Sequence, residues 1–276
     1  MSRGTPSLEI EERVVPVGDG RVELVVQVAG SGPPVVYLHP AAGLAWDPFL
    51  ERLAAEWTVY APQVPGTAAG RPDAIRAVDD LWDLVLLYEE ALRRLGLERP
   101  DLIGQSFGGM LACELAATFP KLPGGLVLLD AIGLWREDAP IVNWVATAPE
   151  QLGALLFHDP EGEAARAALT PPEDPDAAAV AIAATTWAIG CTAKFVWPVP
   201  DKGLVKRLHR IEAPTLVVWG REDRLAPAVY AEEFGSRIAG ARVEVLDDCG
   251  HIPQLEQPEK TFALVSEFLW QQRPAT

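Results

Sequence analysis

The chain has 276 residues, of which 49% are hydrophobic and 22% charged, and its formal net charge is −16 at pH 7. These proportions are ordinary for a soluble globular protein and exclude collagen, a coiled coil and extended disorder. Because an acidic surface repels phosphate backbones and anionic lipids, we expect a small-molecule substrate rather than a nucleic acid or a membrane.

The cysteine and histidine pattern gives no support for a metal site. The three cysteines are widely spaced and the four histidines are scattered, without a CxxC pair, zinc-ligand spacing or HExxH motif. We therefore expect reduced thiols, no metal and no cofactor. The polar N-terminus lacks the apolar core of a signal peptide, and no run of about 18 apolar residues predicts a membrane span. These features favour a cytoplasmic protein, and homo-oligomerisation stays open.

The first half of the chain alternates predicted strands with predicted helices. Two β-branched runs around the turn GDG predict a hairpin within residues 11–32. Short continuous apolar runs are typical of strands buried on both faces of a parallel sheet, and they occur within 33–43, 58–66, 99–104 and 124–133. Apolar residues at helical spacing predict helices over 80–97 and 110–119.

After Gly133 the alternation stops, and an apolar helix is predicted over 177–190. It resumes with the strands 213–220 and 241–248 and the helices 231–240 and 259–272. This order predicts an α/β fold with a mostly parallel sheet and helices on both faces, built by residues 1–133 and 205–276. Residues 134–204 form a mainly helical insertion. We interpret it as a lid, since long insertions in compact domains are usually functional; the alternative is a purely structural excursion.

The stretch GQSFGG at 104–109 lies between a predicted strand and a predicted helix. This is the setting of a nucleophile elbow, in which glycines let the backbone turn sharply and present a serine hydroxyl at the edge of the sheet. Ser106 is the predicted nucleophile, although a glycine-rich turn with an idle serine has the same letters.

A serine nucleophile needs a base, and the chain order in this type of site is serine, acid, histidine. His251 follows the last predicted strand and is the predicted base. Asp223 follows the preceding strand and is the predicted acid, with Glu222 expected to face solvent. Asp130, at the end of the run GLVLLD, is the rival acid.

An acyl-transfer site also needs an oxyanion hole. One donor is expected to be the backbone N–H of Phe107, the residue after the nucleophile. The other should come from the loop HPAAG, in which Pro40 has no N–H, so Ala41 is the first candidate and Ala42 the second. His39 is expected to pin this loop by hydrogen bonds, although it could also line the substrate pocket.

The motifs HPAAG, GQSFGG, WGREDRLAP and GHIPQLEQPE occur in the order found in the α/β-hydrolase superfamily, which the chain resembles from about residue 12 to 270. It looks most like the bacterial branch of carboxylesterases, enol-lactonases, carbon–carbon hydrolases and cofactor-free haloperoxidases. That resemblance implies an eight-stranded sheet and a helical cap inserted after the sixth strand. The sequence departs from many carbon–carbon hydrolases, which have tryptophan where this chain has Ile252.

We therefore expect a serine hydrolase that cleaves a carboxylic ester or lactone. An apolar substrate pocket, or else ordinary packing of the cap, is predicted for the following residues: His39, Ala42, Trp135, Phe157, Trp187, Trp197 and Ile252. The enzymatic alternative is a carbon–carbon hydrolase or enol-lactonase, whose acidic substrate would pair with one of the cations Arg136, Arg166 and Lys194. A non-catalytic small-ligand receptor is the alternative of another class.

Overall fold

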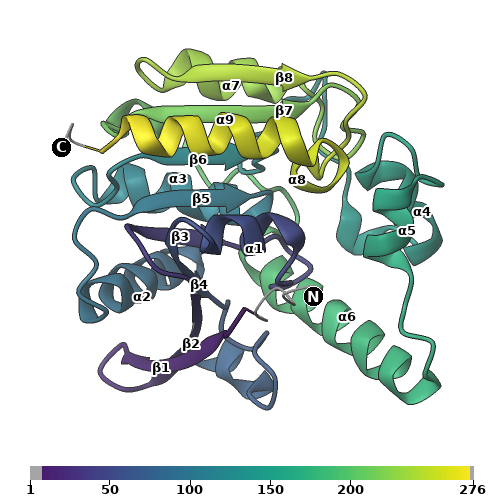
Figure 1. The fold of residues 1–276 in the computed structure, drawn as a ribbon, viewed down its shortest axis with the longest axis horizontal. Helices are drawn as coiled ribbons and strands as arrows, with labels where there is room; N and C mark the ends of the chain where they lie inside the picture. Colours follow the sequence, from purple (N-terminus) through teal and green to yellow (C-terminus); the bar gives the residue numbers. More distant parts are fainter. Residues whose placement is uncertain (1–7, 274–276) are drawn as a thin grey trace, which may run out of the picture.

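The structure, a computed structural model, describes residues 8–273 and contains an eight-stranded sheet (Figure 1). Its strands, in chain order, are β1 (Glu11–Val17), β2 (Val22–Ala29), β3 (Pro34–Leu38), β4 (Thr58–Pro62), β5 (Asp101–Gln105), β6 (Leu126–Leu129), β7 (Thr215–Gly220) and β8 (Arg242–Leu246). Across the sheet they follow the order β1-β2-β4-β3-β5-β6-β7-β8. β2 pairs antiparallel with β1 and β4, and every other neighbouring pair is parallel. The predicted α/β fold is confirmed.

Helices cover both faces of the sheet, as expected. Helices α2 (Leu81–Arg94), α3 (Phe107–Thr118) and α7 (Val229–Arg237) contribute to one apolar core, and α1 (Pro48–Ala54) and α9 (Pro258–Gln271) contribute to the other. Leu102 and Ile103, neighbours on β5, belong to opposite cores because successive side chains of a strand point to opposite faces. Figure 1 shows α1 and α9 in front of the sheet.

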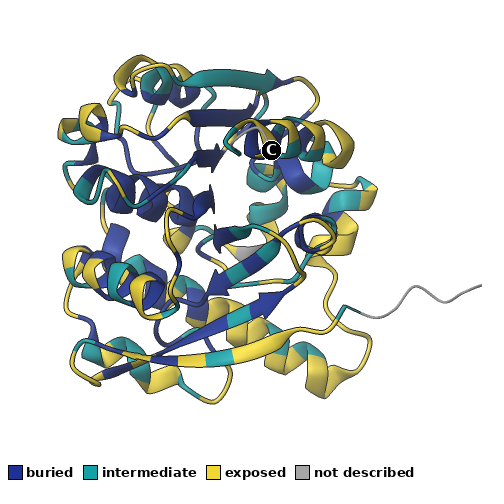
Figure 2. Cartoon of the chain, turned by 60° about the vertical axis from the view of Figure 1, so that its left-hand side comes forward, coloured by how far each residue is buried: buried dark blue, intermediate teal, exposed yellow. Residues whose placement is uncertain are grey.

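The central strands explain the continuous apolar runs of the sequence. Every residue of β5, β6 and β7 is buried, and Figure 2 shows these strands in the interior while β1 is partly exposed at the edge. A strand with helices on both sides has no solvent face, so its sequence does not alternate. The carboxyl ends of these strands carry the loops that contain Ser106, Asp130 and Asp223.

The insertion leaves the sheet after β6 and returns before β7. It contains α4 (Pro149–Leu156), α5 (Glu163–Leu169) and α6 (Pro175–Val196), with a short 3-10 turn at Trp144–Ala146. The short helix α8 (Pro253–Glu256) follows β8 on the core. In Figure 1, α4, α5 and α6 lie toward the side to which the strand β8 points.

The expectation that no stretch is apolar enough to span a membrane is wrong for α6. By length and composition, α6 is long and apolar enough to cross a bilayer, and 28% of its most apolar 18-residue window is buried within the protein. The criterion of an unbroken apolar run missed this helix because threonines and a glycine interrupt its apolar residues. The C-terminal half of α6 packs on the core, where Thr192 Oγ1 donates to the carbonyl of Ala41 at 3.1 Å. Residues 1–7, whose polarity argued against a signal peptide, lie outside the described residues.

One buried ion pair fastens the return segment of the insertion to the core. Glu114 of α3 is 1% exposed, and its carboxylate accepts two hydrogen bonds from Arg207, at 2.9 Å from Nε and 2.7 Å from Nη2. A buried carboxylate without such a partner is strongly destabilising, because its charge has lost its hydration.

We expect Arg207→Met to lower the free energy of unfolding by roughly 2–3 kcal/mol, below the full value for a buried pair because Arg207 is partly exposed. Denaturant unfolding measures this. The double variant Arg207→Met, Glu114→Leu should recover most of the loss, since it removes the stranded charge. A double variant no more stable than Arg207→Met would contradict the buried-charge explanation.

Candidate active site

Ser106 lies at a sharp turn between β5 and α3. Its backbone has φ 53° and ψ −115°, a region that residues other than glycine rarely adopt. The turn is possible because glycines flank it. A Cβ on Gly104 would lie 2.4 Å from the carbonyl oxygen of Gly108, and a Cβ on Gly108 would lie 1.9 Å from that of Leu38. The strand, the turn and the helix therefore meet at distances that exclude any side chain.

The structure brings Ser106, His251 and Asp223 together in one hydrogen-bonded chain. His251 Nε2 lies 2.8 Å from Ser106 Oγ, and His251 Nδ1 lies 2.6 Å from Asp223 Oδ2. Asp223 Oδ1 accepts from the backbone N–H groups of Leu225 at 2.8 Å and Ala226 at 2.9 Å. Ser106, Asp223 and His251 are 6%, 5% and 2% exposed, so the chain is shielded from water.

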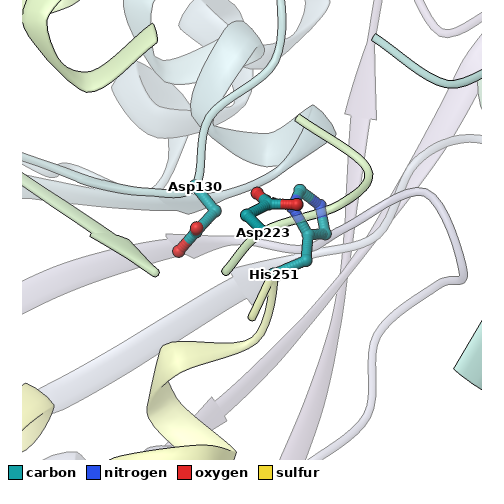
Figure 3. Close-up of side chains that lie close together, drawn as sticks. All are labelled: Asp130, Asp223 and His251. Atoms are coloured by element: carbon teal, nitrogen blue, oxygen red, sulfur yellow. The ribbon is translucent and has the colours of Figure 1, made fainter. Parts of the chain in front are cut away.

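This arrangement can perform nucleophilic catalysis. The Asp223 carboxylate orients the imidazole with the proton on Nδ1, which leaves Nε2 free to accept the proton of the serine hydroxyl. The carboxylate also stabilises the imidazolium that forms when the proton moves. Figure 3 shows Asp223 beside the His251 ring, and the rival acid Asp130 on the other side of Asp223 in this view.

A metal ion does not fit the same cluster, although one donor atom each of Asp130, Asp223 and His251 lies within 4.8 Å of the others. Both ring nitrogens of His251 already have hydrogen-bond partners, Ser106 and Asp223. One oxygen of Asp223 accepts two backbone N–H groups. A metal would have to displace these bonds.

The two expected oxyanion donors lie on different elements: Phe107 is the first residue of α3, and Ala41 lies in the loop after β3. Among the hydrogen bonds of the described residues, none uses the backbone N–H of Phe107 or of Ala41. The ring of Phe107 is fully buried and stacks on Phe195 of α6, with centroids 6.2 Å apart. Helix α6 therefore packs over the first residue of α3 and, through Thr192, over Ala41. The predicted second candidate, Ala42, is exposed.

His39 connects two loops at the same edge of the sheet. Its Nδ1 lies 2.7 Å from the carbonyl oxygen of Pro40, and its Nε2 accepts from the backbone N–H of Val64 at 3.0 Å. Burial lowers the pKa of His39 to about 4, so the ring is neutral at physiological pH. With both nitrogens occupied and 2% exposure, His39 has no free group for a substrate.

The insertion holds the loop that carries His251. The backbone N–H of His251 donates to the carbonyl of Leu156 at the end of α4, at 2.8 Å. Glu256 bridges the two segments, because one carboxylate oxygen accepts from Gly250 N at 2.6 Å and the other from His158 N at 2.7 Å. A Cβ on Gly250 would lie 2.7 Å from the Leu156 carbonyl oxygen, so this contact requires glycine.

The sequence predicted that Glu222 faces solvent, but its side chain also contacts the protein. Its carboxylate accepts from the backbone N–H of Cys249 at 3.0 Å. Arg224, next to the acid, donates to the carbonyl oxygens of Phe157 at 3.0 Å and Ala154 at 3.1 Å in the insertion. Sequence reasoning missed Glu256 and Arg224. Glu256 lies within the motif GHIPQLEQPE, but backbone contacts leave no signal in residue identity.

The aromatic residues predicted for the pocket are distributed over different environments. Trp135 and Trp197 line a cavity of about 180 Å³ with Trp144, and neither Ser106 nor His251 is among its lining residues. Trp187 is 47% exposed and donates from Nε1 to the carbonyl of Gly66 at 3.0 Å. Phe157 is fully buried, and Ile252 is partly buried next to His251. The irregular insertion separates residues that composition alone had grouped.

A family model described as "Alpha/beta hydrolase family" matches residues 35–264. The 2-hydroxy-6-oxo-2,4-heptadienoate hydrolase of Pseudomonas putida is 28% identical, over 91% of this chain and 94% of that protein. Two solved structures have the same fold. A meta-cleavage product hydrolase from Pseudomonas fluorescens has TM-score 0.75 and 21% identity over 95% of this chain and 98% of its own. Naproxen esterase from Bacillus subtilis has TM-score 0.74 and 16% identity over 95% and 92%.

The bridge made by Glu256 gives a test of how the His251 loop is held. Glu256→Gln replaces one acceptor oxygen with an amide that faces a backbone N–H. We expect kcat to fall by roughly tenfold or more with little change in KM, because His251 would shift from Ser106. Steady-state kinetics on any substrate that the parent turns over measures this. Glu259→Gln, an exposed glutamate on α9, is the matched control; equal loss in both variants would contradict the positioning role.

Proposed function

Because the chain belongs to the alpha/beta hydrolase family, we propose that it is a serine hydrolase of carboxylic esters or lactones that works through an acyl-enzyme on Ser106. The observation that carries the proposal is the buried chain from Ser106 Oγ through His251 to Asp223. An aligned serine, imidazole and carboxylate on a nucleophile elbow is the arrangement that acyl transfer requires.

In the proposed mechanism, Ser106 Oγ attacks the substrate carbonyl carbon while His251 Nε2 takes its proton. The resulting oxyanion binds the backbone N–H groups of Phe107 and Ala41, each contributing about 3–4 kcal/mol to the transition state. The tetrahedral intermediate collapses, and His251 gives the proton to the leaving alcohol. Water then attacks the acyl-enzyme with His251 as base, which releases the acid and restores Ser106. Asp223 stays ionised and hydrogen-bonded to Nδ1 throughout.

Residues 134–204 are the proposed cap over this site. Leu156 and Glu256 connect the insertion to the His251 loop, and Thr192 connects α6 to Ala41. The cap therefore contacts the base and an oxyanion donor, two of the groups that must be correctly placed for turnover. Its apolar composition supports a small hydrophobic or aromatic substrate.

Carbon–carbon bond hydrolysis is the second candidate, favoured by the name and the extensive match of the Pseudomonas putida relative. Its acidic substrate would need a cation. The three cations suggested by the sequence have other partners: Arg136 pairs with Asp138 and Glu233, Arg166 donates to the carbonyl of Glu161, and Lys194 donates to that of Val78. These contacts support a neutral ester or lactone over a dienoic acid.

We expect Ser106→Ala to reduce kcat/KM for a short p-nitrophenyl ester by roughly 10⁴-fold, because no other group in the site replaces the nucleophile. Continuous absorbance assays of both proteins measure this. Thermal unfolding of the variant should stay close to that of the parent, since only the hydroxyl and its one hydrogen bond to His251 are removed. Retained hydrolysis in the variant would remove Ser106 from the mechanism.

A substrate panel separates the two hydrolytic candidates. We expect neutral esters and lactones of hydrophobic acids to be turned over with a kcat/KM at least about 100-fold above that for vinylogous diketo acids, because Arg136, Arg166 and Lys194 already have other partners. The reverse ranking would favour carbon–carbon hydrolysis. Tight binding of a panel member without turnover by the intact triad would instead indicate a receptor.

A further inference from the structure

Two buried carboxyl groups lie side by side behind the proposed catalytic histidine. Asp130 follows β6 and is fully buried, and Asp223 follows β7 and is 5% exposed. A carboxyl oxygen of each lies within 4.8 Å of the other and of a ring nitrogen of His251 (Figure 3). The mechanism above uses only Asp223, so the role of Asp130 is open.

The hydrogen bonds of the two groups are unequal. Asp223 has three donors: the backbone N–H groups of Leu225 and Ala226, and Nδ1 of His251. Asp130 Oδ1 accepts one bond, from Gly220 N at 2.9 Å, while Oδ2 is buried without a partner among the described residues. Donors stabilise an anion, so the negative charge belongs on Asp223.

An ionised Asp130 would leave Oδ2 as a buried acceptor with no donor, beside a second anion. Two carboxylates this close in a dry site do not both ionise. The titratable groups that face Asp130 are Asp223, His251, the Cys249 thiol and Glu256, and none supplies a fixed positive charge. Burial, then the charge of Asp223, raises the pKa of Asp130 well above its usual range.

We propose that Asp130 keeps its proton and donates it as a hydrogen bond from Oδ2 to the carboxylate of Asp223, acting as a positioning residue for the acid of the triad. The proposal rests on the proposed function of the Ser106 site. The bond turns the unpaired oxygen into a donor and gives Asp223 a fourth hydrogen bond. It restrains the carboxylate that orients His251 without adding a second charge.

The backbone supports a specific role for this side chain. Asp130 has φ 43°, in the left-handed region, although it is not glycine. Such a conformation is unfavourable for a residue with a side chain and persists where the surrounding structure requires it. Here it places the carboxyl group just beyond the end of β6, where Oδ1 accepts from the N–H of Gly220, the last residue of β7.

Infrared difference spectroscopy tests the protonation directly and needs no substrate. At pH 8 in heavy water, the spectrum of the parent minus that of Asp130→Asn should contain the C=O stretching band of a protonated carboxylic acid. Asp101→Asn is the matched control. Asp101 is also buried, but burial raises its pKa only to about 6, so its substitution should remove a carboxylate band at that pH. A carboxylate band lost in Asp130→Asn would overturn the proposal.

Kinetics then test the donated bond. Asparagine can accept from Gly220 N and still donate to Asp223, whereas leucine has the same shape and no donor. We expect kcat of Asp130→Asn to exceed that of Asp130→Leu by about tenfold or more at similar KM. Equal kcat in the two variants would overturn the positioning role. The infrared result stands even if Asp130→Leu does not fold or Ser106 proves not to be the nucleophile.

The pH dependence of stability gives a third measurement. A carboxyl group that is protonated in the folded chain and ionised in the unfolded chain contributes stability that is lost as pH rises from its ordinary pKa toward its folded one. Asp130→Asn removes this dependence. The free energy of unfolding of the variant minus that of the parent should therefore increase between about pH 5 and pH 8. A constant difference between the two proteins would contradict a protonated Asp130.

Discussion

The structure depends on one close approach, where β5 turns into α3 at Ser106. The positive φ of Ser106 is possible because Gly104 and Gly108 let the strand, the turn and β3 meet without side chains between them. The turn places the serine hydroxyl beyond the carboxyl end of the sheet, at the N-terminus of α3. The other groups of the site reach the same place because β5, β6, β7 and β8 all run in the same direction and end at this edge.

Carboxyl groups connect the loops at this edge: one accepts from an imidazole ring, and two accept from backbone N–H groups. Asp223 orients the imidazole of His251, Glu256 ties two backbone N–H groups of neighbouring segments, and Glu222 holds Cys249 N. The insertion takes part, since a carbonyl of α4 accepts from the backbone of His251. Displacement of the insertion would therefore move the backbone of His251, so the position of the insertion and the geometry of the site are linked.

The sequence predicted the fold and the members of the hydrogen-bonded chain well, because both leave local signals. Continuous apolar runs indicated the central strands, and GQSFGG between a strand and a helix singled out Ser106. Contacts made by backbone groups were not predictable, as with Glu222, which was expected in solvent but binds Cys249 N. The positions of the aromatic side chains were not predictable for a related reason: in an irregular insertion, nothing in the spacing of Trp135, Trp187 and Trp197 says which way each side chain points.

The central claim is that Ser106 carries the acyl group during turnover. Rapid quenching of the protein with a slowly hydrolysed p-nitrophenyl ester, followed by peptide mapping by mass spectrometry, tests it most directly. The acyl group should be found on the peptide that contains Ser106, at a level that rises and decays with the burst of p-nitrophenol. Turnover with no adduct on that peptide, or with the acyl group on another residue, would contradict the account.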